Sequence, residues 1–88
     1  MPRADVRALR ALANTMANEL QAAYAEVLLS QIRGSVYPST THMDMFEAVA
    51  PPRQMGMYLA HLMERIESEP HPSIPMMKRV ERIVMSLG

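Results

Sequence analysis

The chain has 88 residues, nine basic and nine acidic side chains, and no cysteine. This length suits one small domain, and a net charge of zero gives no general attraction to nucleic acid or to an anionic membrane. The absence of cysteine excludes disulfides, thiolate metal sites and cysteine nucleophiles, and it favours a cytoplasmic protein. No apolar run is long enough for a signal peptide or a transmembrane span, so we expect no membrane partner.

The first predicted element is a long helix over about residues 3–33. Apolar residues recur at alternating spacings of three and four, the register of a helix that packs along another helix. The residues in this register are Val6, Leu9, Ala13, Met16, Leu20, Ala23 and Val27. Good helix formers fill the remaining positions and no proline interrupts them. Such a helix would be roughly 45 Å long, more than the rest of so short a chain can cover.

The apolar face of this helix widens along its length, because Tyr24, Leu28, Leu29 and Ile32 lie outside the register. We therefore expect residues 6–20 to form an association seam, made by Val6, Leu9, Ala13, Met16 and Leu20. We expect residues 23–32 to form the spine of the monomer's own core. The helix should end at Gly34, which accepts the left-handed conformation of a helix C-terminus.

Three shorter helices are predicted after a loop at residues 35–41. Thr41 and Asp44 approximate a capping box, which places a second helix at about 42–50, and Pro51 and Pro52 end it. The third helix covers about residues 52–68. A proline-rich connector follows, and Pro75 opens a fourth helix over about 75–87.

Each short helix has apolar residues at helical spacing that predict its inner face. These are Met43, Phe46 and Val49, then Met55, Leu59, Leu62 and Ile66, and then Met76, Met77, Val80, Ile83, Val84 and Leu87. No stretch alternates polar and apolar residues for long enough to form a strand. We therefore predict an all-α fold, a single domain over residues 1–88. Its three short helices pack around the C-terminal half of the long helix, and dimerisation completes this small helical bundle, in which an antiparallel pair of long helices would be compact.

Few residues suggest catalysis. His61, Glu64 and Glu67 lie one helical turn apart, but their register places them on the outer face of the third helix, which favours a solvated surface over a metal site. No serine lies in a Gly-x-Ser-x-Gly turn, and the glycines do not form a phosphate-binding loop. We expect no enzyme activity, cofactor, metal or small-molecule substrate.

Methionine is the strongest anomaly in the composition, with ten residues. Methionine adapts to irregular cores and also to surfaces that bind varied partners. Met45, Met57 and Met85 lie off the predicted inner faces, so we assign them to partner binding. The favoured function is a small interaction protein, such as an adaptor, inhibitor or regulator, that forms a homodimer and binds another protein.

A dimeric DNA-binding regulator is the second hypothesis. The Pro51–Pro52 junction has the form of a helix-turn-helix in which Arg53 and Gln54 would read bases. Lys78, Arg79 and Arg82 would contact phosphates. The neutral charge and the missing turn glycine weigh against nucleic acid as the partner. A structural subunit of a larger assembly is the third hypothesis.

Overall fold

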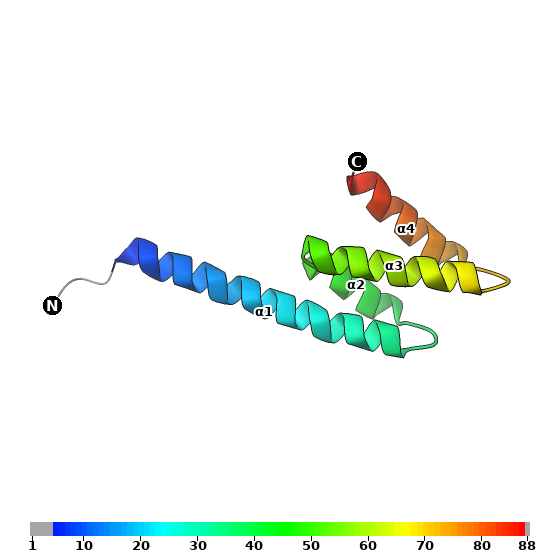
Figure 1. Cartoon of the computed structure of the whole chain (residues 1–88), viewed down its shortest axis with the longest axis horizontal. Coiled ribbons are helices and arrows are strands. Elements are labelled where there is room, and N and C mark those ends of the chain that lie inside the picture. Colours follow the sequence, from blue (N-terminus) through cyan, green and yellow to red (C-terminus); the bar gives the residue numbers. More distant parts are fainter. Residues whose placement is uncertain (1–4, 88) are drawn as a thin grey trace. The chain divides into compact units, whose positions relative to one another are not determined.

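The computed structural model describes residues 5–87, and all regular structure in this range is helical. Within it lie four helices, α1 (Val6–Gly34), α2 (Thr40–Val49), α3 (Pro52–Ser68) and α4 (Ile74–Leu87), which Figure 1 shows. The described residues contain no strand. The predicted all-α class with a long first helix is therefore confirmed, and that helix has 29 residues.

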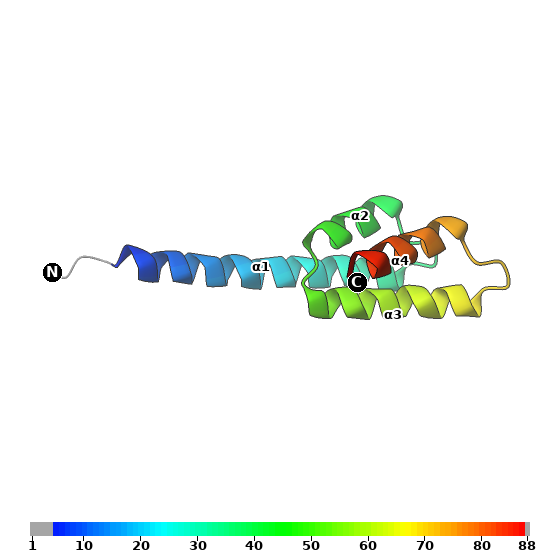
Figure 2. The same ribbon diagram turned by 90° about the horizontal axis from the view of Figure 1, so that it is seen from above.

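The helices pair in chain order, α1 with α2 and α3 with α4. Contacts within the chain form two compact units, one on either side of the junction between Pro51 and Pro52. The predicted packing of a short helix against the C-terminal half of α1 is observed for α2 (Figure 2). The single domain, with α3 and α4 around the same helix, stays a prediction.

Polar caps define both ends of α1. The Asp5 carboxylate accepts a hydrogen bond from the Arg7 backbone N–H at 2.9 Å, so the helix begins at Val6. The predicted start at residue 3 lies outside the described residues. Gly34 is the last helical residue, and its predicted left-handed conformation is wrong, because no glycine in residues 5–87 has a positive φ. Ser35 ends the helix instead, with its hydroxyl donating to the Gln31 carbonyl at 3.0 Å.

Ser39, rather than Thr41, caps α2. The Ser39 hydroxyl accepts from the His42 backbone N–H at 3.3 Å, so the helix starts at Thr40, two residues before the predicted start. Serine is the slightly better N-cap, and the earlier start adds backbone hydrogen bonds. The helix ends at Val49 because Pro51 and Pro52 lack the N–H groups that would continue its hydrogen bonding.

The unit formed by α1 and α2 has its own small core. Its buried side chains are Ala25, Leu28, Leu29 and Ile32 from α1, and Met43 and Phe46 from α2. A polar contact reinforces this packing, because the Gln21 side-chain amide donates to the Val49 carbonyl at 2.6 Å. That carbonyl lies at the end of α2, where helical carbonyls lack partners of their own. Nothing in the sequence pattern indicates this contact between residues 28 positions apart.

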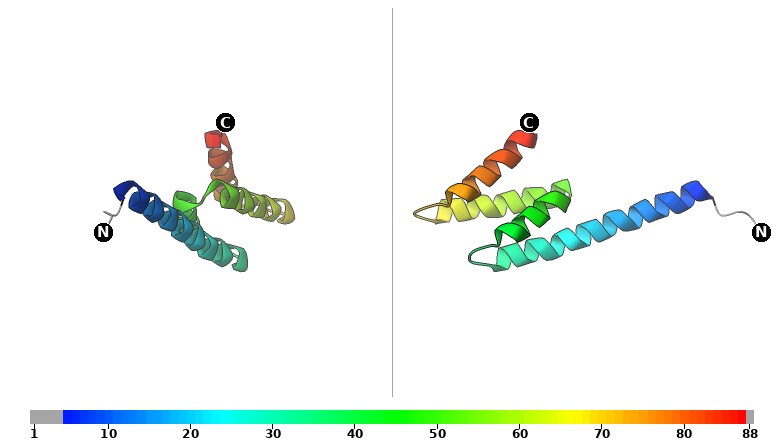
Figure 3. Two further views of the ribbon diagram at one scale, coloured as in Figure 1. Left: turned by 60° about the vertical axis from the view of Figure 1, so that its left-hand side comes forward. Right: turned by 180° about the vertical axis from the view of Figure 1, so that it is seen from behind.

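The second unit is a helical hairpin of α3 and α4. The bounds of α3 coincide with the predicted range, whereas α4 starts at Ile74, one residue before its predicted start. The Ser73 hydroxyl explains this difference, since it accepts from the Met76 backbone N–H at 3.3 Å and so acts as the cap. The two helices diverge from their connection towards the C-terminus (Figures 1 and 3).

The buried faces of this hairpin differ from the predicted ones. In α3, Tyr58 and Leu62 are buried, and His61 is half-buried rather than on the outer face. Tyr58 has one of the largest fully buried side chains, while the predicted inner residues Met55, Leu59 and Ile66 are half-buried. In α4, Val80 and Ile83 are buried. The predicted inner residues Met77, Val84 and Leu87 are exposed, as expected for a helix that diverges from its neighbour.

Candidate protein-interaction surface

The N-terminal half of α1 has no neighbouring helix within its unit. Figures 1 and 3 show α2 beside the C-terminal part of α1 only. Every residue from Asp5 to Leu20 is exposed. About four helical turns of α1 therefore lack packing from α2.

These exposed turns carry a continuous apolar stripe, here called the outer stripe. It consists of the seven residues in the predicted register, Val6, Leu9, Ala13, Met16, Leu20, Ala23 and Val27, all of which are exposed. Its five large side chains are 54–69% exposed. At about 100° per residue, the stripe occupies an arc roughly 100° wide. Single exposed apolar residues are ordinary on protein surfaces, whereas a contiguous apolar patch indicates an interaction site.

The outer stripe and the buried face of α1 point to different sides of the helix. The centre of the buried set Ala25, Leu28, Leu29 and Ile32 is rotated by roughly 140° from the centre of the stripe. Ala23 and Val27, predicted to belong to the monomer's core, are exposed for this reason. The predicted division of the helix into two successive segments is therefore corrected. The helix has two faces, and the stripe extends to Val27 rather than ending at Leu20.

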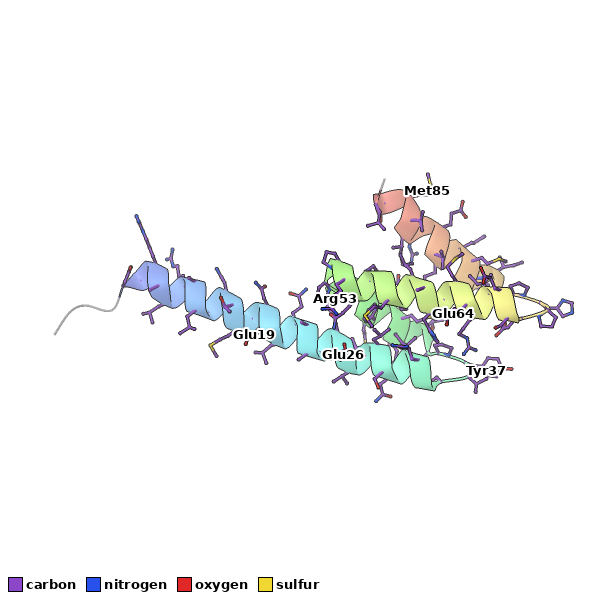
Figure 4. All side chains as sticks on the ribbon, in the orientation of Figure 1. Glu19, Glu26, Tyr37, Arg53, Glu64 and Met85 are labelled. Atoms are coloured by element: carbon purple, nitrogen blue, oxygen red, sulfur yellow. The ribbon has the colours of Figure 1, made fainter. Side chains whose placement is uncertain are left out.

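Polar residues flank the outer stripe asymmetrically. One side, here called the acidic flank, has four positions at intervals of seven, occupied by Asp5, Leu12, Glu19 and Glu26. The other side, here called the donor flank, has the same spacing and holds Arg10, Ala17, Tyr24 and Gln31. All eight residues are exposed. Figure 4 shows Glu19 and Glu26 on the same side of α1, seven residues apart.

The methionines assigned to partner binding are also exposed. The exposed fractions are 39% for Met45, 42% for Met57 and 74% for Met85. Each lies on a different helix, Met45 on α2, Met57 on α3 and Met85 on α4. Met85 projects from the last turns of α4 (Figure 4), next to the exposed Val84. The role of these residues in binding stays a prediction.

The residues of the DNA-binding hypothesis are accessible to different degrees. Arg53 is exposed in the first turn of α3 (Figure 4), and Gln54 beside it is half-buried. On α4, Lys78 and Arg82 are exposed and Arg79 is half-buried. The DNA-binding role of these residues stays a prediction.

Residues 5–87 contain neither a metal-binding cluster nor a helix that could span a membrane. No group of three or more His, Asp or Glu side chains in this range is placed to hold a metal ion. None of the helices in the same range combines the length and the apolar character needed to cross a bilayer.

No protein-family model matches this sequence, and neither a curated protein nor a solved structure shows significant similarity to it. Its function is therefore inferred from its own residues, among which the outer stripe is the most extensive exposed apolar feature of α1.

Proposed function

We propose that this protein is a small protein–protein interaction module, an adaptor, inhibitor or regulator, that forms a homodimer through the outer stripe of α1. The exposure of that stripe is the observation that carries the proposal. An isolated helix of about 12–15 residues is only marginally stable in water, and its apolar face gains stability when another helix covers it. A second copy supplies such a helix with a matching face.

The expected affinity is moderate. The stripe has five large side chains in each copy, and alanine occupies its other two positions. Association also costs translational and rotational freedom, which a short seam offsets only in part. We therefore expect a dissociation constant in roughly the micromolar range.

Sedimentation equilibrium of the wild-type chain and of Leu9→Glu tests the proposal. The wild-type protein should change from monomer to dimer as its concentration rises. Leu9→Glu should remain a folded monomer, because a carboxylate in the seam would have to be desolvated without a partner. Its far-UV circular dichroism should still show the packed helices.

Asn18→Glu is the matched control, since residue 18 is half a turn around the helix from Leu9 and gains the same charge. This variant should dimerise like the wild type. Leu28→Glu should behave differently from both, because Leu28 is buried and the substitution should unfold the α1–α2 unit. A wild-type chain that stays monomeric at every concentration would refute self-association.

The exposed residues Met45, Met57 and Met85 support the second part of the proposal, binding of another protein. Methionine side chains are flexible and polarizable, and they adapt their packing to the surface of a partner. A cytoplasmic location stays a prediction from the sequence.

A further inference from the structure

The polar residues beside the outer stripe carry information about the orientation of the second copy. We infer that the two α1 helices pair in parallel, as a two-stranded coiled coil. This inference rests on the self-association proposed above and specifies its geometry.

In a parallel pair with two-fold symmetry, the acidic flank of one helix faces the donor flank of the other, and each residue lies opposite the residue five positions further along. Four pairs result, Asp5 with Arg10, Leu12 with Ala17, Glu19 with Tyr24, and Glu26 with Gln31, the second residue of each belonging to the second copy. One pair is apolar. In the other three, a carboxylate meets a guanidinium, a hydroxyl or an amide, each of which donates hydrogen bonds. The two-fold axis repeats these four pairs on the other side of the dimer.

Asp5 can take part although it already caps α1. One of its carboxylate oxygens accepts from the Arg7 backbone N–H. An ionised carboxylate has acceptor capacity for further bonds, so Arg10 of the second copy can approach the remaining positions.

An antiparallel pair has the opposite arrangement of flanks. The two-fold axis then brings the acidic flank of one helix beside the acidic flank of the other, and the donor flanks meet on the far side. Asp5 of one copy would approach Glu26 of the second, which places like charges together. Arg10 would have no carboxylate opposite it.

The apolar positions of the stripe can pair in either orientation, so the flanks decide between them. Val6, Ala13, Leu20 and Val27 occupy one of its two alternating positions, and Leu9, Met16 and Ala23 occupy the other. α2 leaves the stripe uncovered, because it packs on the side of α1 marked by Leu28 and Ile32.

Parallel pairing has a consequence for binding. Both copies of α2 then lie beside the C-terminal part of the coiled coil, at the same end of the dimer. A partner with two copies of a binding site could engage both protomers at once, which raises its apparent affinity.

Disulfide crosslinking tests the orientation. The wild-type chain has no cysteine, so only the introduced thiols can form disulfides. Leu9→Cys and Leu20→Cys are prepared with different tags, mixed in the reduced state and mildly oxidised. Parallel pairing should crosslink each variant to itself, because residues of the same number face each other within disulfide distance. It should give no bond between the two variants, because their introduced thiols would be about 16 Å apart along the axis.

The other results are equally informative. A dimer that crosslinks only between the two variants, or does not crosslink at all, overturns the parallel orientation and leaves self-association intact. Absence of a dimer in sedimentation of the reduced wild-type chain overturns the proposed self-association itself, and the orientation with it.

A charge substitution gives a second measurement. Tyr24→Lys should strengthen a parallel dimer about two- to fivefold, because the introduced ammonium group of each copy pairs with Glu19 of the other copy. Tyr24→Phe is the control for loss of the hydroxyl and should weaken the dimer slightly. Weaker association of Tyr24→Lys than of Tyr24→Phe would contradict the parallel orientation.

Discussion

At the scale of single residues, serine hydroxyls decide where two of the four described helices begin. Ser39 and Ser73 each accept a hydrogen bond from a backbone N–H three residues further along, at 3.3 Å in both cases. Their caps start α2 and α4 earlier than the sequence pattern predicts. Ser39, Thr40 and Thr41 are consecutive, so the pattern alone offers competing caps, and the extended backbone of Ser39 makes it the cap.

Replacing the observed cap tests this assignment. Ser39→Ala should lower the free energy of unfolding by about 1 kcal/mol, because the His42 N–H loses its acceptor. Thr41→Ala, which removes the cap predicted from the sequence, should change it by less than about 0.5 kcal/mol. Urea unfolding followed by circular dichroism measures both values. A larger loss for Thr41→Ala than for Ser39→Ala would contradict the assignment.

Gly56 is a glycine inside a helix with open space around its Cα. It lies in α3 on an exposed part of the surface, and a Cβ added there would meet no atom within 4 Å. Its backbone has no positive φ. Gly56→Ala should therefore stabilise the protein by about 0.5–1 kcal/mol and raise its Tm by roughly 3–6 °C. Calorimetry measures the change, and a lower Tm would show that Gly56 has a role outside the packing described.

At the scale of elements, α1 combines two surfaces that the sequence pattern merges. One face packs on α2 through Leu28, Leu29 and Ile32, and the outer stripe lies on another side. The first four turns have the stripe and no internal neighbour within the unit. Their helical conformation should therefore depend on the second copy.

Dilution tests this dependence. As the wild-type protein is diluted through its dimerisation midpoint, its ellipticity at 222 nm should weaken, because residues 6–20 lose the helix that covers them. Leu9→Glu should have the weaker signal at every concentration. A wild-type signal that stays constant while sedimentation reports dissociation would show that this segment is helical without a partner.

At the scale of the whole molecule, the chain comprises two helical pairs that each bury a small core. The described core residues number ten, six in the α1–α2 unit and four in the hairpin. Small cores provide limited stability, and association is a common way in which short chains gain more. Dimerisation through α1 would add buried apolar surface without requiring any rearrangement of α2.

Local sequence patterns predict the helices and much of the proposed interface. Apolar periodicity and proline positions gave the all-α class and the bounds of α3, because both depend on residues close together in the chain. The same periodicity identified the residues of the outer stripe, from Val6 to Val27, although only Val6 to Leu20 were predicted to form the association seam.

Which side of each helix is buried depends on the packing between helices. In the sequence, the apolar face of α1 widens at Tyr24, which predicted two successive segments along the helix. Packing on α2 instead gives the helix two faces on different sides, and Val27 lies on the exposed face. Neighbours distant in sequence likewise decide the burial of Tyr58, the hydrogen bond between Gln21 and Val49, and the exposure of Val84. Periodicity fixes the positions of residues around one helix relative to one another. Only the position of the packed neighbour decides which of these residues face the core.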